Sequence, residues 1–386
     1  MSCSRCTWQA HTKCKDCGTL YCGQVCFYKD WGNHGPTVCG KSDPPSAVGP
    51  EFWNHLCEKK NRYQTFKREA FDKIFTWETK LGSGNFGIVY KIQEKKSGKF
   101  YALKLLYNPD QDFDKEIDVH CAISKYNPNI LQYYGAFKIV YEEKLMQALL
   151  MEYIDGLALE SLLENPRELV FWNVLKTKPS EIRVKVALTV LKGVLNDLTP
   201  LHKHKVAHRD VKSANIIVTF VAGKPQTYTF MTGAVLIDYG FACRLTSVPG
   251  SDDGVSCSTW GGTLLVTPPE ILAFRLKGLQ HPPVALDFCA ADIWAVGTIL
   301  WELLIGENPF EKALTGKGRK HTLLELKRII PEAIQSLQED IDFLSNHGHL
   351  REILLSMLQI EPAKRITAAE LHQAYPDLLV LTLESK

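Results

Sequence analysis

The pattern of hydrophobic and polar residues changes along the chain and separates strand-rich from helix-rich segments. From Trp77 to Leu106 the pattern is that of β-strands. A helix is expected from about Ser180 to His204, and a long hairpin is expected between Ile216 and Ile237. Ahead of the strands, Glu51 to Phe71 carries apolar residues among many charges, which predicts an amphipathic helix that packs on the following domain.

Composition limits the class of protein. The 386 residues are 45% hydrophobic, which suffices for two or three domains. The most apolar segment, Ile293 to Ile305, is shorter than a membrane span and carries Glu302. The N-terminus lacks the basic-then-apolar layout of a signal peptide, and the net charge is only +2. We therefore expect an intracellular protein, cytoplasmic or nuclear, without a nucleic-acid or membrane partner.

Potential metal ligands are crowded into the first 39 residues. They are Cys3, Cys6, Cys14, Cys17, Cys22, Cys26, His34 and Cys39. Eight thiolate and imidazole ligands suffice for two tetrahedral, structural Zn²⁺ ions, and metal binding would supply the folding energy of so short a segment. A disulfide scaffold is the alternative, but the large, intracellular-looking domain that follows favours reduced thiols. Two closed sites would leave no open position for a zinc hydrolase.

The spacing of these ligands resembles the MYND-type zinc finger, with Tyr21 before Cys22 and Trp31 before His34. The resemblance implies interleaved sites, with Cys3, Cys6, Cys22 and Cys26 on one ion and Cys14, Cys17, His34 and Cys39 on the other. Two adjacent, non-interleaved sites are also compatible with the spacing. The family further implies a peptide-motif partner for the finger. Residues 40–52, rich in Pro, Gly and Ser, are expected to be a linker.

The stretch from His208 to Asn215 contains the residue types that phosphoryl transfer requires. Asp210 is followed by Lys212 and by Asn215. Phosphoryl transfer uses a carboxylate to orient the attacking hydroxyl, a cation near the moving group and an oxygen ligand for the metal. A charged loop with one Asn is usually only a solvated turn, so the stretch is informative only together with its neighbours.

Other motifs surround this stretch in a fixed order. Upstream are the glycines of Leu81 to Val89 and the segment Ala102-Leu103-Lys104; downstream are Asp238-Tyr239-Gly240 and Pro268-Pro269-Glu270. In this order the motifs resemble the eukaryotic-type protein kinase family over roughly residues 75–378. The resemblance implies an α+β, bilobal kinase fold with a β-rich N-lobe and a helical C-lobe. The zinc-stabilised finger (1–39) and a linker with one helix (40–74) would precede it.

The resemblance also implies where ATP and Mg²⁺ bind. The expected nucleotide-binding residues are Leu81, Gly82, Ser83, Gly84, Asn85, Phe86, Gly87, Ile88, Val89, Ala102, Lys104 and Glu152. Lys104 would contact the α- and β-phosphates, while Asn215 and Asp238 would hold Mg²⁺. Asp210 would orient the acceptor hydroxyl and accept its proton, and Lys212 would stabilise the transferred phosphoryl group.

The acidic partner of Lys104 is either Glu116 or Asp118. The positions of the apolar residues along this segment favour Glu116. An alignment with the family that contains no gap selects Asp118 instead. We expect Glu116, because Glu reaches farther and matches the family. His120 then stands where the family usually has an apolar spine residue. Farther along, Asp292 would hold the backbone of the catalytic loop, and Glu270 would pair with Arg365.

Together these features predict a serine/threonine protein kinase that transfers the γ-phosphoryl group of ATP to protein substrates. Lys212 and Gly262-Thr263 favour serine and threonine over tyrosine as acceptors. The alternative is a pseudokinase scaffold that binds partners through the finger, but the complete polar set favours activity. Glu270, Asp292 and the long segment from Phe241 to Leu265 disfavour a small-molecule kinase.

Overall fold

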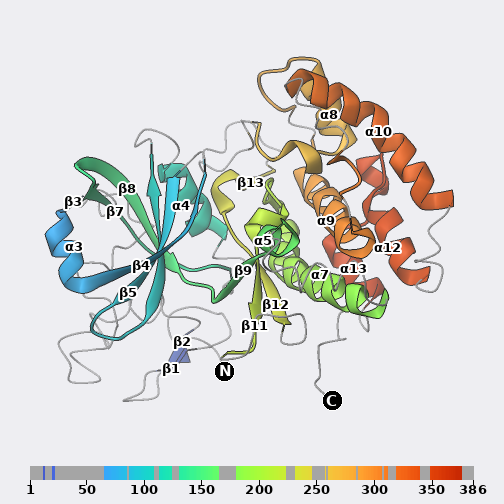
Figure 1. The fold of residues 1–386 in the computed structure, drawn as a ribbon. Coiled ribbons are helices and arrows are strands. Elements are labelled where there is room, and N and C mark those ends of the chain that lie inside the picture. Colours follow the sequence, from blue (N-terminus) through green and yellow to red (C-terminus); the bar gives the residue numbers. More distant parts are fainter. Residues whose placement is uncertain are drawn as a thin grey trace. The chain divides into compact units, whose positions relative to one another are not determined.

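The computed structural model describes residues 12–13, 20–21, 65–84, 87–107, 113–123, 130–164, 180–222, 231–245, 257, 260–283, 286–306, 308–311, 319–339 and 348–375 (Figure 1). The chain divides into two compact units, Met1–Tyr153 and Ile154–Lys386. Among the described residues, strands dominate the first unit and helices the second. This division agrees with the expected β-rich and helical lobes.

A six-stranded sheet with the order β3-β7-β8-β6-β5-β4 forms the first unit. Its strands are β3 (Thr65–Phe66), β4 (Phe75–Ser83), β5 (Gly87–Glu94), β6 (Phe100–Leu106), β7 (Tyr133–Tyr141) and β8 (Lys144–Glu152). Strands β4 to β6 confirm the prediction for Trp77 to Leu106. Tyr101, Leu103 and Leu105 of β6 point to one face, as the two-residue period of a strand requires, and are buried in the core of this unit.

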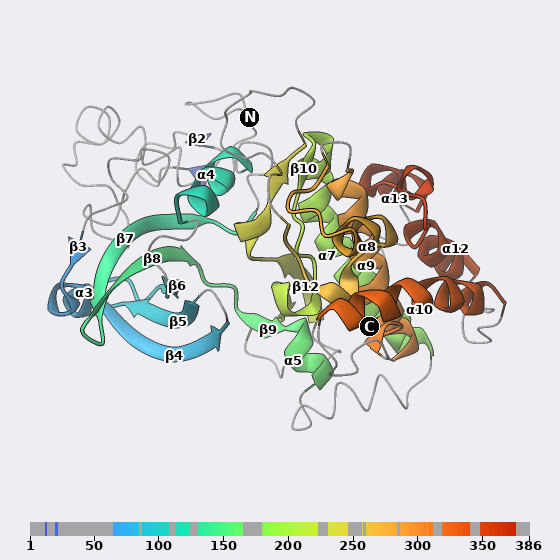
Figure 2. The same cartoon turned by 90° about the horizontal axis from the view of Figure 1, so that it is seen from above.

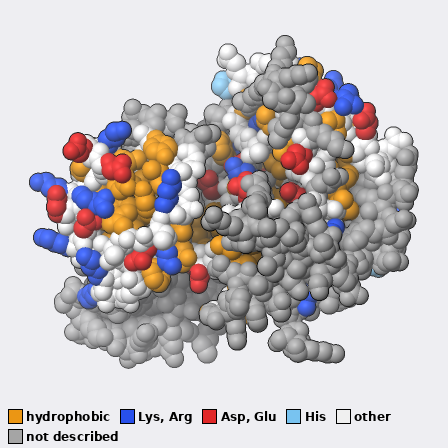
Figure 3. All heavy atoms as spheres, in the orientation of Figure 1, with side chains coloured by type: hydrophobic (Ala, Val, Ile, Leu, Met, Phe, Trp, Pro, Cys, Tyr) orange, Lys and Arg blue, Asp and Glu red, His pale blue; other side chains and the backbone are white. Residues whose placement is uncertain are grey.

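Helix α4 (Phe113–Ile123) lies beside the sheet (Figure 2). Its Glu116 accepts hydrogen bonds from Lys104 of β6 and Tyr133 of β7, and its His120 bonds to the carbonyl of Leu131 just before β7. In the space-filling view, hydrophobic side chains of the first unit gather over the sheet, with charged side chains around them (Figure 3). Exposed Leu81 of β4 and Leu145 of β8 show that some apolar surface of the sheet is open.

The predicted helix from Glu51 to Phe71 is wrong at Thr65 and Phe66, although its last residues are helical. Residues 51–64 lie outside the described residues, but Thr65 and Phe66 form β3, and helix α3 spans Arg68–Ile74. Strand β3 pairs with β7, and the Phe66 ring meets the Phe137 ring edge-on at 5.2 Å. Sheet pairing and aromatic packing therefore override the local helical pattern.

Of the first 64 residues, the structure describes only the antiparallel pair β1 (Thr12–Lys13) and β2 (Leu20–Tyr21). All eight predicted zinc ligands, from Cys3 to Cys39, lie outside the described residues, as does most of the predicted linker and helix at 40–74.

Helix α9 (Phe288–Ile305) is the centre of the second unit. Helices α7 (Ser180–Lys203) and α12 (Gly348–Met357) contact it, α13 (Ala368–Ala374) contacts α7, and α10 (Arg319–Glu339) contacts α8 (Pro269–Leu276) (Figure 2). The Asp287 side chain caps the start of α9 by accepting from the Ala290 N–H, and Gly306, at φ 96°, ends it in the left-handed conformation that glycine favours. Helix α7 confirms the prediction for Ser180 to His204.

Helix α9 is long and apolar enough to cross a membrane, and 78% of it is buried inside the protein. A helix that is surrounded by other helices is apolar on all sides, which accounts for its composition. Elsewhere in the part of the chain that the structure describes, no helix meets this test.

Short strands of the second unit place the loops of the site. β9 (Gly156–Ala158), β11 (Ile216–Phe220) and β12 (Met231–Leu236) form one antiparallel sheet next to α5 (Leu159–Glu164). β10 (Val206–Ala207) pairs with β13 (Cys243–Arg244). The loop from His208 to Asn215 therefore runs from the end of β10 to the start of β11, and β12 leads into Asp238.

Candidate active site

In the first unit, a strand and a helix bring Lys104 and Glu116 together. Lys104 stands on β6, and its Nζ lies 3.0 Å from Glu116 Oε1 and 3.1 Å from Oε2. Both side chains are largely buried, with exposed fractions of 11% and 8%. A buried ion pair is held in one geometry more firmly than an exposed one. Glu116 is thus the acid that the structure pairs with Lys104, as the apolar phase of the segment predicted.

The glycine-rich hairpin joins β4 to β5. Gly84 N–H donates to Gly87 O at 3.0 Å, which closes the turn, while Asn85 and Phe86 lie outside the described residues. A Cβ on Gly87 would lie 2.0 Å from the Leu105 carbonyl oxygen, so only glycine fits where the start of β5 pairs with the end of β6. The hairpin is therefore tied to the strand that carries Lys104.

Two more predicted nucleotide-binding residues stand on paired strands. Ala102 of β6 is buried and is the register partner of Met151 in β8. Glu152 ends β8; its N–H donates to Gln132 O at 2.7 Å, and its carboxylate accepts from Gln132 N–H at 3.2 Å. The Glu152 side chain thus fixes the end of the strand.

In the second unit, three side chains converge on Asp210. Lys212 Nζ lies 2.9 Å from Asp210 Oδ2, Asn215 Nδ2 donates to the same oxygen at 3.0 Å, and Thr263 Oγ1 donates to Oδ1 at 3.1 Å. Asp210 is only 4% exposed. Its carboxylate is therefore oriented by partners from its own loop and from the segment before α8.

One carboxylate of the central helix α9 holds the backbone of this loop through hydrogen bonds. Asp292 accepts from the backbone N–H groups of His208 and Arg209, each at 2.7 Å, and from His202 Nε2 at 3.0 Å. Arg209 adopts a φ of 70°, which is uncommon for a side chain of this size. The contacts to Asp292 offset this local strain, and they confirm the role predicted for Asp292.

Asp238 and Asn215 stand at the neighbouring ends of two paired strands. Ile216 pairs with Leu236, and Ile237 N–H donates to Asn215 O at 2.8 Å. Asn215 Nδ2 is engaged by Asp210, so its amide oxygen is the group left for a metal. One amide and one carboxylate oxygen suit Mg²⁺, which usually keeps several waters and binds substrate phosphates. No cluster of three or more His, Cys, Asp or Glu that could hold a metal occurs in the described ranges.

Tyr239 follows Asp238 at a position where the kinase family that these motifs resemble usually has phenylalanine. Its ring is fully buried and meets the His208 ring at 4.9 Å, but its hydroxyl has no hydrogen-bond partner within the described structure. Burial raises the pKa of this hydroxyl well above its ordinary value, with smaller contributions from Asp197 and Asp292. The aromatic packing is kept, while the added hydroxyl costs about 1–3 kcal/mol of desolvation.

Asp197 of α7 is a buried acid that the sequence analysis missed. Its carboxylate accepts from Leu236 N–H at 2.9 Å, two residues before Asp238. Burial raises its pKa to about 7, while the hydrogen bond from Leu236 opposes the rise. An acid inside the apolar run Val186 to Leu198 is the signal that could have identified it. Asp197 ties the helix to the strand that positions Asp238.

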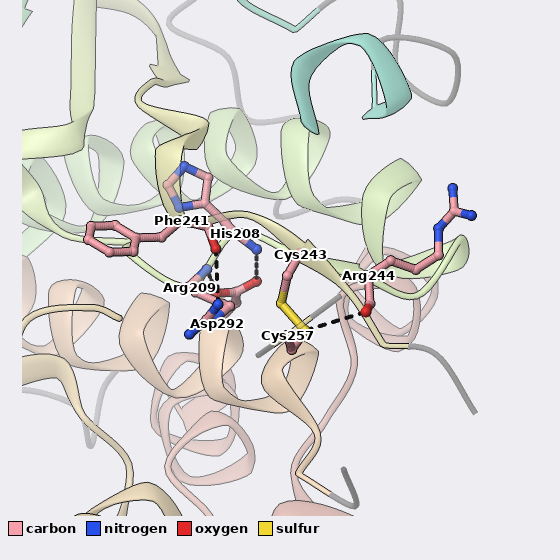
Figure 4. Close-up of a disulfide and its surroundings, with 7 residues drawn as sticks. All are labelled: His208, Arg209, Phe241, Cys243, Arg244, Cys257 and Asp292. Atoms are coloured by element: carbon pink, nitrogen blue, oxygen red, sulfur yellow. Dashed lines mark hydrogen bonds between the residues drawn. A yellow bond between two sulfur atoms is a disulfide. The ribbon is translucent and has the colours of Figure 1, made fainter. Parts of the chain in front are cut away.

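The segment after Asp238 contains a disulfide between Cys243 and Cys257 (Figure 4). Cys243 is fully buried beside Ala207, Ile271 and Phe288. Figure 4 shows the disulfide close to the contacts between Asp292 and the loop. Reduced thiols were expected because the domain looks intracellular, and no local sequence pattern relates Cys243 to Cys257, which are 14 positions apart.

The remaining predicted contacts of the second unit are present. Arg365 Nη1 and Nη2 donate to the two oxygens of Glu270 at 2.9 and 3.1 Å, and Nη1 also donates to Ala290 O at 2.7 Å. This bidentate pair joins the start of α8 to the region before α13. Pro268, where the kinase family usually has alanine, is the N-cap residue before α8 and leaves the pair intact.

Comparisons with known proteins agree with this geometry. A family model described as "Protein kinase domain" matches residues 75–375. Death-associated protein kinase 2 of Mus musculus is 26% identical over 318 residues, which cover 80% of this chain and 72% of that protein. Serine/threonine-protein kinase sid1 of Schizosaccharomyces pombe is 29% identical over 304 residues, which cover 78% of this chain and 53% of the relative.

Serine/threonine-protein kinase KIC1 of Saccharomyces cerevisiae is 26% identical over 319 residues, or 79% of this chain. The match spans only 24% of KIC1, so the similarity concerns one domain of that longer protein. The names of sid1 and KIC1 describe serine/threonine-protein kinases, and the name of the mouse relative describes a protein kinase. The family model covers most of this chain, and the chain therefore belongs to the protein kinase family.

Proposed function

We propose that this protein is an active serine/threonine kinase that transfers the γ-phosphoryl group of ATP to hydroxyl groups of protein substrates. The observation that carries the proposal is the convergence of Lys212, Asn215 and Thr263 on the buried Asp210. A carboxylate held in this way can orient an acceptor hydroxyl and accept its proton.

The other residues supply binding and electrostatic stabilisation. Lys104, oriented by Glu116, would contact the α- and β-phosphates of ATP, and Lys212 would stabilise the transferred phosphoryl group. Asn215 and Asp238 would hold Mg²⁺, which when bound neutralises charge on the phosphates. The loop residues need little rearrangement, because Asp292 already fixes their backbone.

A pseudokinase scaffold is the competing function. It would be favoured by the loss of a polar group at one of these positions, yet Lys104, Asp210, Asn215 and Asp238 are all present. Lys104 and Asp210 also make the contacts that their roles require. The geometry therefore favours activity.

The test is transfer of labelled phosphate from ATP, with Mg²⁺, to generic acceptor proteins, followed by phosphoamino-acid analysis. We expect phosphoserine and phosphothreonine, and far less of both when Asp210 is replaced by Asn. Protein that binds ATP but never transfers phosphate would support the scaffold instead.

We also propose that residues 1–39 form a MYND-type finger with two structural Zn²⁺ ions, which recruits a peptide-motif partner inside the cell. The support is the spacing of its seven Cys and one His, together with the described hairpin β1–β2, whose strands flank Cys14 and Cys17 in the sequence. Metal analysis should return about two equivalents of zinc per chain. Disulfide mapping that pairs Cys3 with Cys39 would overturn this assignment.

A further inference from the structure

We propose that Tyr133 is a positioning residue for the Lys104–Glu116 pair. Its hydroxyl donates to Glu116 Oε1 at 2.8 Å, the same oxygen that lies 3.0 Å from Lys104 Nζ. Tyr133 is 1% exposed and Glu116 is 6% exposed, so water does not compete freely for this bond. The inference rests on the role proposed above for Lys104 and Glu116.

A second contact holds the Tyr133 ring in place. His120 stacks on it with ring centres 3.9 Å apart and planes only 7° apart. His120 Nε2 donates to Leu131 O at 2.9 Å, two residues before Tyr133 on the same segment. Burial lowers the pKa of His120 to about 4, so the stacked ring is neutral at physiological pH.

Helix geometry explains why these contacts act together. Glu116 and His120 are four residues apart, so they project from the same face of α4. Glu116 accepts a hydrogen bond from the Tyr133 hydroxyl, and His120 stacks on the Tyr133 ring. The acid that orients Lys104 is therefore tied to β7 as well as to β6. Lys104 thereby meets a carboxylate whose position is already set.

The variant Tyr133→Phe removes the hydroxyl and keeps the ring that stacks on His120. A hydrogen bond to a charged group is worth enough that kcat/KM for ATP should fall about tenfold. KM for the acceptor protein should stay unchanged, because the contact orients a phosphate-binding lysine. Tyr134→Phe is the matched control: Tyr134 is a buried neighbour on the same strand whose ring packs on Tyr101, and its variant should keep the wild-type kcat/KM.

A double-mutant cycle with Glu116→Gln separates positioning from a general loss of stability. If Tyr133 acts through Glu116, then the double variant loses no more kcat/KM for ATP than Glu116→Gln alone. Additive losses, or an unchanged Tyr133→Phe variant, would overturn the inference. A wild-type-like Glu116→Gln variant would instead overturn the role proposed for the ion pair, so the two failures are distinguishable. Thermal unfolding of each variant checks that the fold is kept.

Discussion

The two units position their polar residues in different ways. In the first unit, Lys104 and Glu116 come from a strand and a helix, and Tyr133 from a third element orients the acid. In the second unit, Asp210, Lys212 and Asn215 belong to one short loop, and Asp292 fixes the loop backbone. The first arrangement depends on how elements pack, whereas the second depends mostly on local chain geometry.

Buried titratable groups extend this contrast to pH. In the first unit, His120 is buried in its neutral form, so acid opposes folding. In the second unit, Asp197 is buried with a raised pKa, so ionisation of its carboxyl as pH rises opposes folding. Between about pH 4 and 7, the stabilities of the two units should therefore change with pH in opposite directions.

The largest effect is expected for Asp210→Asn, which tests the loop of the second unit. The change removes the charge that orients the acceptor hydroxyl and accepts its proton, so phosphate transfer should fall by roughly 10²–10⁴-fold. Nucleotide binding by calorimetry should stay close to wild type. The contrasting variant is Lys104→Met in the first unit, which should weaken nucleotide binding itself. If both variants were impaired in the same step, either nucleotide binding or phosphate transfer, then the separate roles assigned to the two units would be wrong.

Asp197→Asn should change the pH dependence of the second unit. The carboxyl has an ordinary pKa near 3.8 when unfolded and a pKa of about 7 when folded. The folded state therefore binds the extra proton between these values, and stability falls as pH rises from about 4 to 7. At pH 8 the penalty is on the order of 4 kcal/mol, and Asn removes it. Chemical denaturation at pH 5 and pH 8 measures the slope.

The control for Asp197 is Asp155→Asn, because Asp155 is an exposed residue of the same unit. That variant should keep the wild-type slope. A pH profile for Asp197→Asn that overlays the wild-type curve would show that the buried carboxyl has an ordinary pKa.

Removal of the disulfide should loosen the segment after Asp238. Cys243 and Cys257 are 14 positions apart, and a loop of this length is worth about 3 kcal/mol. The double variant Cys243→Ala, Cys257→Ala should therefore be less stable than wild type, and reductant should have no further effect on it. Cys289→Ala, which removes a free thiol, is the control. Wild-type stability that is indifferent to reductant would argue against the bond.

The smallest effect is expected for His120 of the first unit, where a fall in pH should lower the stability. Its pKa is 6.5 in the ordinary state and about 4 when buried, so the unfolded chain binds a proton first as pH falls. Stability should therefore be lost between about pH 6.5 and 4, by about 2 kcal/mol at pH 5. His120→Leu should flatten this loss, whereas exposed His349→Leu should not. Hydrogen exchange of α4 at pH 7 and pH 5 would report this loss of stability. An equal loss in wild type and in His120→Leu would contradict the prediction.

The sequence by itself determined the motifs and their order. Asp210, Lys212 and Asn215 could be predicted because they are close in the chain, and the same holds for strands β4 to β6 and helix α7, whose patterns are long and regular. Glu116 was chosen over Asp118 from the apolar phase of its helix, and the structure pairs it with Lys104.

Only the tertiary structure decided the contacts between distant residues. Tyr133 lies 17 residues from Glu116, and Asp197 lies 39 residues from Leu236, so no local pattern relates them. Sheet pairing made a strand of Thr65 and Phe66 within a predicted helix, and the pairing of β10 with β13 fixed the strand that carries Cys243. Spacing encodes which groups a short loop can present, but packing between elements decides which buried groups meet, because that depends on the whole fold.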